Sequence, residues 1–358
     1  MRGKLGRLFA IGVILIGLFL VLGRDWLADR AFQRALDTSV GVDQSAALPD
    51  GLHAYVCGSG SPMPDATRAG PCIAVLAGQQ AFIFDAGSGS IRKLLRMGFP
   101  IPKAQAAFLT HLHSDHFDGL GELLLQAWVG GSRSAPLPVH GPQGTDQVVG
   151  GLMQAYQIDK GYRIAHHGAA IVRPEGFGGA AQIIDLPAGA NSAVVHDRDG
   201  VRITAIRVDH APISPALGYR IDYKGRSLAI SGDTVFSASF NAAAKGVDVM
   251  FHEALNMEMV AALGAKLAER GRKDSAQIMT DIQNYHASPV DAARAAQTAG
   301  AKALVLYHLV PPVPVRLIER KFLGDAPAAF DGDLRLAEDG MMISLPAGGK
   351  SIDFSNAF

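Results

Sequence analysis

The first thing this sequence lacks is net charge. Its 358 residues contain 33 Lys and Arg against 33 Asp and Glu, so the formal charge is zero at pH 7. A surface that binds a polyanion usually carries an excess of basic residues. The charge balance therefore predicts that nucleic acid is not a partner of this chain.

Cysteine is also scarce, because only Cys57 and Cys72 occur in the whole chain. Two thiols are too few to bind a metal ion by themselves, which excludes a cysteine-only zinc site. The two residues flank a turn rich in Gly and Pro, GSGSPMPDATRAGP. They would meet if the segments on either side pair as neighbouring strands. The sequence leaves a disulfide and two buried free thiols equally open.

The N-terminus differs from the rest of the chain. Arg2, Lys4 and Arg7 precede LFAIGVILIGLFLVLG, an uncharged run over residues 8–23. A basic flank before an apolar run is typical of a secretory signal or a single membrane anchor. The run lacks an A-x-A cleavage pattern, which favours an uncleaved anchor over a cleaved signal, and both over a buried core helix.

Either interpretation sends the remaining chain across a membrane. The residue pattern resembles that of bacterial exported proteins, so we expect the inner membrane, with the catalytic domain in the periplasm. If the segment is cleaved, we expect the periplasm alone, where disulfides persist. The organisation expected is an anchor or signal at 1–24, a charged, partly helical connector at 25–50 and a catalytic domain at 51–358.

From residue 51 onwards, short apolar segments alternate with helix-like ones. The segments LHAYVC, CIAVLA, QAFIFDAG and AQAAFLT predict strands, and so do VRITAIRVDH, LGYRIDYKGRSLAISGDT, VDVMFHEAL and AKALVLYH. Residues 160–200 are predicted to be Gly-rich chain with short strands, and 255–285 to be loop. No low-complexity linker divides the region. We predict an α/β domain of two related halves, with two packed sheets covered by helices.

The segment THLHSDHFDG, residues 110–119, contains three of the twelve histidines in the chain. His111 and His113 are two residues apart, so in an extended chain their imidazoles point to the same side. Asp115 and His116 follow where the chain must turn into a helix, so they face a neighbouring point. One loop therefore supplies the beginnings of two metal sites.

Two cations need further ligands, including an anionic one that limits their mutual repulsion. His210, Asp233 and His308 each end an apolar strand, so they would collect at one edge of the sheets. A carboxylate and a hydroxide that bridge two metals roughly 3.5–4 Å apart form an established arrangement. We predict that Asp233 is this bridge. A single histidine at a strand end more often caps the strand, so the loop carries most of the argument.

Several motifs resemble one family. HLHSDH resembles the signature of the metallo-β-lactamase fold, an αββα sandwich. CGSGSPMPDATRAGPCIAV is similar to the start of the branch with ribonuclease Z and arylsulfatase-like enzymes, and VHGPQGT, VDHAPISPALGYRI, AISGDT, FHEAL, YHAS and LVLYH match in order. The resemblance covers about residues 52–310. It implies a hydrolase in which Asp85 of IFDAG supports the metal loop.

The resemblance also implies two metal sites that share one carboxylate. The first would consist of His111, His113, His210 and Asp233, and the second of Asp115, His116, Asp233 and His308. Nitrogen and oxygen ligands without a thiolate suit two Zn²⁺ ions and also tolerate Mn or Fe. A water shared by two such ions would be a hydroxide at neutral pH and would attack an ester. We expect Asp115 to orient it.

A leaving alkoxide needs a proton, and His286 in NYHASP is the candidate donor. In the related ribonucleases a histidine at this motif pairs with a glutamate, and the matching residue here is Glu253 of FHEAL. That carboxylate would orient His286 and raise its pKa. The alternative is that His286 caps the next helix, but Ser288 already serves as the cap.

The substrate is the least determined feature. We expect small phosphate or sulfate esters, as for arylsulfatase- or phosphodiesterase-like enzymes; the alternatives are a ribonuclease Z-type tRNA 3′ endonuclease and a lactone or β-lactam hydrolase. Bacterial ribonuclease Z proteins carry a long insertion between GYRI and SGDT, but only ten residues separate Ile221 from Gly232 here. The missing insertion, zero net charge and expected export favour a small-molecule ester over tRNA. A homodimer is compatible with the sequence.

Overall fold

The computed structural model describes residues 2–358, which form two units, one ending at Ala46 and one spanning Ala47–Phe358. The first unit holds α1 (Arg2–Leu22), α2 (Arg24–Ser39) and most of the short helix η1 (Gln44–Ala47). In the described part of the chain, no single helix has the length and apolarity to cross a membrane. Two helical segments, Ala10–Val21 and Arg24–Thr38, are together long and apolar enough to do so, although they are bent by 52° relative to each other; this rests on length and composition alone. The membrane anchor remains a prediction.

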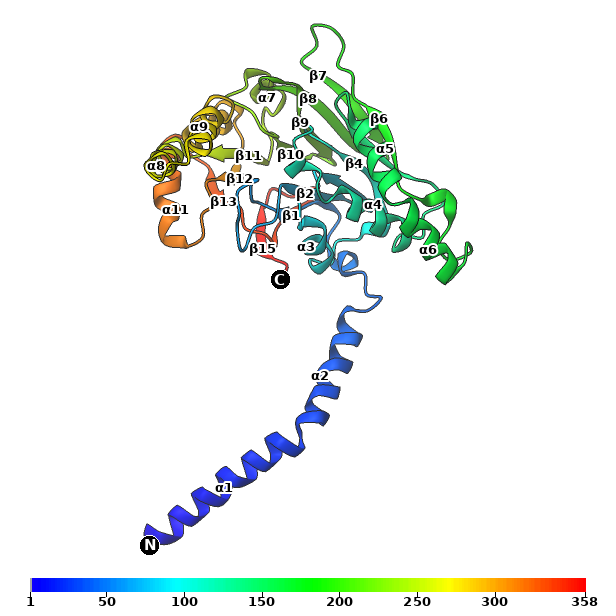
Figure 1. Ribbon diagram of the computed structural model, residues 1–358, viewed down its shortest axis with the longest axis vertical. Helices are drawn as coiled ribbons and strands as arrows, with labels where there is room; N and C mark the ends of the chain where they lie inside the picture. Colours follow the sequence, from blue (N-terminus) through cyan, green and yellow to red (C-terminus); the bar gives the residue numbers. More distant parts are fainter. Residues whose placement is uncertain (1) are drawn as a thin grey trace. The chain divides into compact units, whose positions relative to one another are not determined.

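Two sheets form the centre of the large unit (Figure 1). The first has the order β15-β14-β1-β2-β3-β4-β5-β6 and the second β13-β12-β11-β10-β9-β8-β7. The strands of the first sheet are β1 Gly51–Gly58, β2 Cys72–Ala77, β3 Gln80–Phe84, β4 Ala104–Phe108, β5 Leu137–Gly141, β6 Gly179–Ile183, β14 Met341–Pro346 and β15 Asp353–Asn356. Those of the second are β7 Ser192–Arg198, β8 Val201–His210, β9 Ile213–Tyr223, β10 Arg226–Ile230, β11 Val249–Leu255, β12 Ala303–Val310 and β13 Asp333–Leu336.

Helices cover the outer face of each sheet, because alternate strand residues point outward and are apolar too. The first sheet carries α3 Ser90–Arg96, α4 Leu120–Val129 and α5 Thr145–Ala155, and the second carries α7 Ala238–Ala243, α10 Pro289–Ala299 and α11 Arg316–Leu323. A separate cluster of buried apolar residues, rich in Phe, Val and Ile, fills the space between the two sheets. The predicted αββα sandwich is therefore confirmed.

Three helices occupy segments where no helix was expected. α6 (Gln157–His167) lies where short strands were predicted, and α8 (Met257–Glu269) and α9 (Lys273–Asp281) lie in the segment predicted as loop. Neither α6 nor α9 buries a single side chain. The apolar residues of these helices do recur at helical spacing, as Ile158 and Tyr162 do in α6, so the sequence carried a helical signal that the interpretation missed.

The two cysteines form a disulfide. β1 and β2 pair antiparallel, with Gly58 opposite Cys72 at a bulge, which brings the Cα atoms of Cys57 and Cys72 to 5.1 Å. Both residues are fully buried. The alternative of two free thiols is excluded in this structure.

Strand direction gathers the candidate ligands of the second sheet. β10, β11 and β12 run parallel, and β8 has the same direction because β9 is antiparallel to both β8 and β10. The carboxyl ends of parallel strands lie at one edge of a sheet, where sites in such folds form. This edge bears His210 at the end of β8, Asp233 just beyond β10, and Glu253 and His308 two residues before the ends of β11 and β12.

Candidate metal centre

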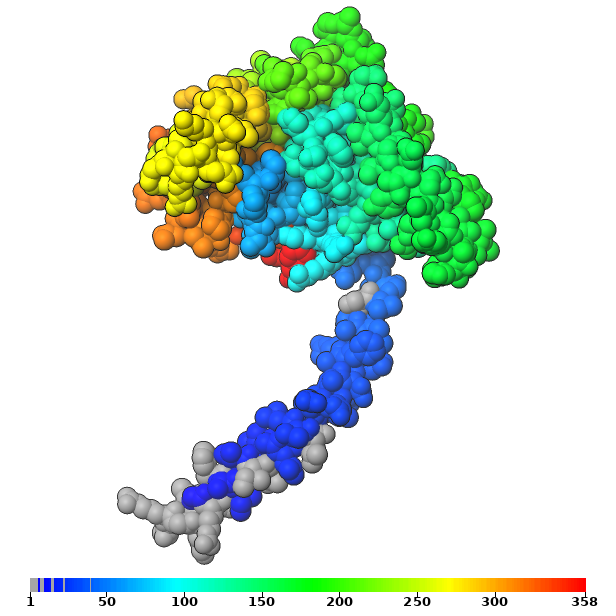
Figure 2. All heavy atoms as spheres, in the orientation of Figure 1, coloured from blue at the N-terminus to red at the C-terminus, as the bar shows by residue number. Residues whose placement is uncertain are grey.

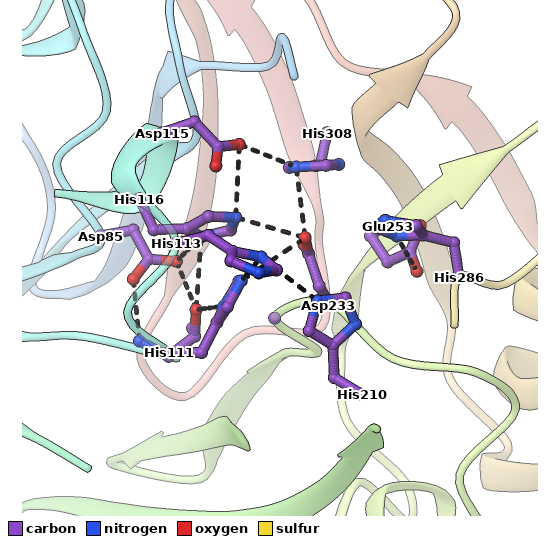
Figure 3. A network of polar contacts seen from close by, with 12 residues as sticks. Asp85, His111, His113, Asp115, His116, His210, Asp233, Glu253, His286 and His308 are labelled. Carbon is purple, nitrogen blue, oxygen red and sulfur yellow. Dashed lines mark hydrogen bonds and ion pairs between the residues drawn. The ribbon is translucent and has the colours of Figure 1, made fainter. Parts of the chain in front are cut away.

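All seven candidate ligands come together at that edge (Figure 3). The loop after β4 supplies four of them, and the ends of β8, β10 and β12 supply the other three. Ligand atoms of His111, His113, His210 and Asp233 lie within 4.8 Å of one another, and so do those of Asp115, His116 and His308. The structure thus brings the predicted residues together in two groups, and their role as metal ligands stays a prediction.

The first group consists of three imidazoles and one carboxylate. His111 Nε2 lies 2.9 Å from His113 Nδ1, and His210 Nε2 lies 3.4 Å from the same atom. The Asp233 carboxylate completes the group, with Oδ2 at 3.8 Å from His111 Nε2. The extended backbone at His113 turns its ring to the same side as that of His111.

The second group shares that carboxylate oxygen. His116 Nε2 and His308 Nε2 each lie 3.3 Å from Asp233 Oδ2. Asp115 Oδ2 lies 3.6 Å from His116 Nε2 and 3.3 Å from His308 Nε2. The oxygen of Asp233 therefore faces both groups, which is the placement a bridging ligand requires.

The arrangement fits two divalent ions. His116 Nε2 and Asp233 Oδ1 are buried without a hydrogen-bond partner among the described residues, whereas buried polar atoms normally have one. Ligand atoms about 2.0–2.2 Å from a tetrahedral ion lie roughly 3.3 Å apart, close to the separations seen here. The set of imidazoles and carboxylates suits Zn²⁺, Mn²⁺ or Fe²⁺ and does not choose among them.

Burial and neighbouring charges set the protonation that metal binding needs. Burial, reinforced by the nearby His116, lowers the pKa of His111 well below its usual value, so the imidazole is neutral and its nitrogen is free to bind. Burial disfavours the ionised form of Asp233, but His308 and His116 outweigh it and lower its pKa well below the usual value. Asp233 is therefore a carboxylate.

Asp85 supports the metal loop through hydrogen bonds, as the resemblance implied. Its carboxylate accepts hydrogen bonds from Thr110 N at 2.8 Å, Thr110 Oγ1 at 2.9 Å and His116 Nδ1 at 2.8 Å. The last bond fixes which nitrogen of His116 carries the proton and turns Nε2 toward Asp233 (Figure 3). Asp85 adopts a left-handed backbone with φ of 56°.

The structure shows two further hydrogen bonds near the centre that the sequence did not predict. His210 Nδ1 donates to the backbone oxygen of Tyr285 at 2.9 Å, which aims Nε2 at His113. The only sequence signal for Tyr285 was its place beside His286. Thr234, the residue after Asp233, donates through Oγ1 to the backbone oxygen of Asp209 at 3.1 Å.

His286 and Glu253 form a pair beside the two groups. His286 Nδ1 donates to Glu253 Oε1 at 3.0 Å, and the same oxygen accepts from Ala287 N at 2.9 Å. Burial opposes the charged imidazole, but the Glu253 carboxylate outweighs it and raises the pKa of His286 to about 9. His286 also lies within 4.8 Å of the ligand atoms of Asp233 and His308. It is a cationic acid at neutral pH.

Comparison with known proteins assigns the family. Residues 80–309 match the family model described as the beta-lactamase superfamily domain. Ribonuclease Z of Mycobacterium bovis (strain BCG / Pasteur 1173P2) is 36% identical over 290 residues, which cover 80% of this chain and 96% of the relative. The chain belongs to the ribonuclease Z branch of the metallo-β-lactamase superfamily. Ribonuclease Z of Mycolicibacterium gilvum is 35% identical, with 80% of this chain and 94% of the relative covered.

Solved structures agree with the fold of this family. The metallo-β-lactamase fold protein YhfI from Bacillus subtilis has a TM-score of 0.58 at 22% identity, with 83% of this chain and all of that chain covered. The short form of human tRNase Z has a TM-score of 0.56 at 21% identity, covering 82% and 99%. The ribonuclease Z-like chain described here is thus a metal-dependent hydrolase that acts on ester bonds.

These relatives correct the prediction that nucleic acid is not a partner, because the close homologues are ribonucleases. They also favour the ribonuclease alternative over the arylsulfatase-like hypothesis. Net charge is a sum over the whole surface and does not report where the basic residues lie. The missing insertion does not separate the chain from its relatives either. The match covers 96% of the Mycobacterium bovis protein, which leaves little room for a long arm that this chain lacks.

Proposed function

We propose that the chain is a dinuclear metal-dependent phosphodiesterase that cleaves RNA, and precursor tRNA is the substrate on which this activity is tested. The observation that carries the proposal is the similarity to proteins named ribonuclease Z over nearly their whole length. The two ligand groups that meet at Asp233 support it, since two metals side by side suit in-line displacement at phosphorus.

The proposal assigns a role to each residue of the centre. The first ion would be held by His111, His113, His210 and Asp233, and the second by Asp115, His116, His308 and Asp233. The ions would lower the pKa of water to provide a nucleophile at neutral pH and would stabilise charge on the phosphate oxygens. Asp115 also orients the attacking water. Asp85 fixes the ring of His116 through its hydrogen bond.

His286 supplies the proton that the leaving ribose oxygen requires. A ribose alkoxide is a poor leaving group, so proton transfer in the transition state speeds its departure. The raised pKa keeps His286 charged at neutral pH, and the Glu253 carboxylate holds Nδ1, which leaves Nε2 free to donate. Glu253 thus positions the acid and does not touch the substrate.

The test is a substrate panel with the full-length, metal-loaded protein. Precursor tRNA, bis(p-nitrophenyl) phosphate, an aryl sulfate and a lactone are compared by kcat/KM at one salt concentration. We expect cleavage of the precursor tRNA at one site and hydrolysis of the phosphodiester, with the sulfate and lactone slow. Hydrolysis of the sulfate or lactone with intact RNA would contradict the proposal.

The compartment is a separate proposal. We propose that the catalytic domain works outside the cytoplasm, at the inner membrane or free in the periplasm. Two observations support it: the basic and then apolar N-terminal segment, and the disulfide between Cys57 and Cys72. Disulfides persist in oxidising compartments and are rare in the cytosol. The test is a fusion of the C-terminus to a reporter enzyme that is active only in the cytoplasm. Activity of this reporter would contradict the proposal.

A further inference from the structure

Two helices project from the edge that carries the candidate metal centre. We name residues 257–281, which contain α8 and α9, the α8–α9 arm. It begins directly after Asn256, whose side chain caps α8 by accepting from Met259 N at 2.8 Å. It ends at the short helix η5 (Ile282–Asn284), which leads through Tyr285 to His286. Both ends of the arm are therefore tied to segments that support the centre.

Only the base of the arm is packed against the domain. Leu255, Val260 and Val310 form a small buried cluster there, and the partly buried side chains around it are Met63, Met257, Met279 and Ile282. Beyond this base α8 buries only Gly264, and α9 buries no residue. A Cβ at position 264 would lie 3.1 Å from Met279 Cβ, so glycine lets the two helices approach closely. Figure 2 shows the arm in yellow as a bulge on the surface of the domain.

The tip of the arm concentrates unpaired positive charge. Arg270, Arg272 and Lys273 are exposed, and no ion pair joins them to a carboxylate in the described part of the chain. Arg272 donates to Ser275 Oγ at 3.2 Å. The neighbouring Lys266 is neutralised by Glu269 at 2.5 Å, and Asp274 is the one other acidic residue beside the tip.

The clustering of these cations sets them apart, because other exposed cations of the domain either form ion pairs or, like Arg198, Lys245 and Lys350, lie far from one another in the chain. Arg202, Lys224 and Arg335 each form an ion pair with a carboxylate, at 2.8, 2.5 and 2.8 Å. Because the whole chain has no net charge, three unpaired cations within four residues are a local feature and not a result of general basicity. Their guanidinium and ammonium groups match phosphate oxygens.

We propose that the tip of the α8–α9 arm binds phosphates of the RNA substrate at a distance from the scissile bond. This proposal rests on the proposed function. α8 has 13 residues, so at about 1.5 Å per residue it carries the tip roughly 20 Å from its base. Contacts with phosphates fix the position of a nucleic acid without reading its sequence. The tip therefore positions the RNA, and the centre at the base of the arm cleaves it.

The test compares a tip variant with a matched control. The tip variant carries Arg270→Gln, Arg272→Gln and Lys273→Gln. The control variant carries Arg198→Gln, Lys245→Gln and Lys350→Gln, which removes three exposed cations from the opposite edge of the sheets. KM and kcat are measured for precursor tRNA and bis(p-nitrophenyl) phosphate, and binding of fluorescein-labelled precursor tRNA is followed by anisotropy over a range of salt concentrations.

In the tip variant we expect KM and Kd for the RNA to rise roughly tenfold, and the slope of log Kd against log salt to fall by about 2 for three lost phosphate contacts. The rate with the small diester stays unchanged, and the control variant resembles the wild type. Equal losses in the tip and control variants, or unchanged RNA binding in the tip variant, would overturn the proposal. Binding of the tip variant to anionic vesicles is measured as well. If this variant loses vesicle binding but keeps RNA binding, the proposal is overturned, because the tip would then face a lipid surface.

The anisotropy measurement separates this proposal from the proposed function. A wild-type protein that binds RNA through the tip but does not cleave it contradicts the proposed activity and leaves the phosphate contact standing. A wild-type protein that cleaves RNA with no contribution from the tip contradicts only the docking surface. A wild-type protein that neither binds nor cleaves RNA overturns both.

Discussion

Asp85 and His116 are joined by a hydrogen bond of 2.8 Å that directs the free nitrogen of the imidazole to the shared carboxylate of Asp233. The bond ties the end of β3 to the loop after β4, two segments that are 31 residues apart in the chain. A histidine that binds a metal usually donates its other nitrogen to such a group, which sets the tautomer and the ring orientation.

Replacement of this support should weaken metal binding without unfolding the protein. In Asp85→Asn we expect the affinity for Zn²⁺ to fall about 10–100-fold, because an amide holds the ring less firmly than a carboxylate. Asparagine tolerates the left-handed backbone at this position, so the fold is kept. Competition with a chromogenic chelator measures the affinity. An unchanged affinity with an unchanged circular dichroism spectrum would show that Asp85 does not support the centre.

The role of His286 predicts a dependence on the leaving group. His286→Ala should slow cleavage of precursor tRNA by roughly 10²–10⁴-fold, because the ribose oxygen needs a proton as it leaves. Hydrolysis of bis(p-nitrophenyl) phosphate should fall far less, because nitrophenolate leaves without one. Both rates are measured at equal metal content. If both substrates slow by the same factor, His286 is not the proton donor.

The pKa of His286 predicts the alkaline limit of activity. The imidazole is charged below about pH 9 and loses its proton above that value, so kcat/KM for RNA should fall as the pH rises through about 9. In Glu253→Gln the carboxylate that raises the pKa of His286 is gone, so burial lowers the pKa and only Asp233 still opposes it. The alkaline limb of the profile should then move to lower pH. A limb at the same pH in both proteins would assign it to another group.

The disulfide predicts a dependence of stability on reductant. Closing a loop of about 15 residues stabilises a fold by roughly 3 kcal/mol in the chain-entropy model. Adding dithiothreitol should therefore lower the free energy of unfolding of the wild type in urea by about 2–4 kcal/mol. The Cys57→Ser/Cys72→Ser variant is the control and should not respond to the reductant. A wild type with the same unfolding midpoint in both conditions would argue against the bond.

The positions of the candidate ligands could be predicted from the sequence because these residues lie in or shortly after apolar strands. His111 and His113 follow a short apolar strand with a spacing that fixes their relative direction. His210 ends β8, and His308 lies two residues before the end of β12. The parallel direction of those strands is a general property of such sheets, so their ends meet. The structure adds the distances that make Asp233 common to both groups.

The substrate class and the α8–α9 arm could not be predicted in the same way. The segment 257–281 was predicted as loop, although its apolar residues recur at helical spacing; its two helices bury few side chains. The charge argument failed because it used a sum over the chain, which does not report that Arg270, Arg272 and Lys273 are grouped within four residues. Burial and ion pairing of each charge are needed, and the composition gives neither.

The most direct test of the central claim is the rate of precursor tRNA cleavage as Zn²⁺ or Mn²⁺ is added stepwise to metal-free protein. We predict no cleavage without metal, because the buried imidazoles and carboxylates alone supply no nucleophile. The rate should rise and reach its plateau at two equivalents per chain, since Asp233 serves both groups. Cleavage by the metal-free protein, a plateau at one equivalent, or intact RNA with two ions bound would contradict a dinuclear ribonuclease.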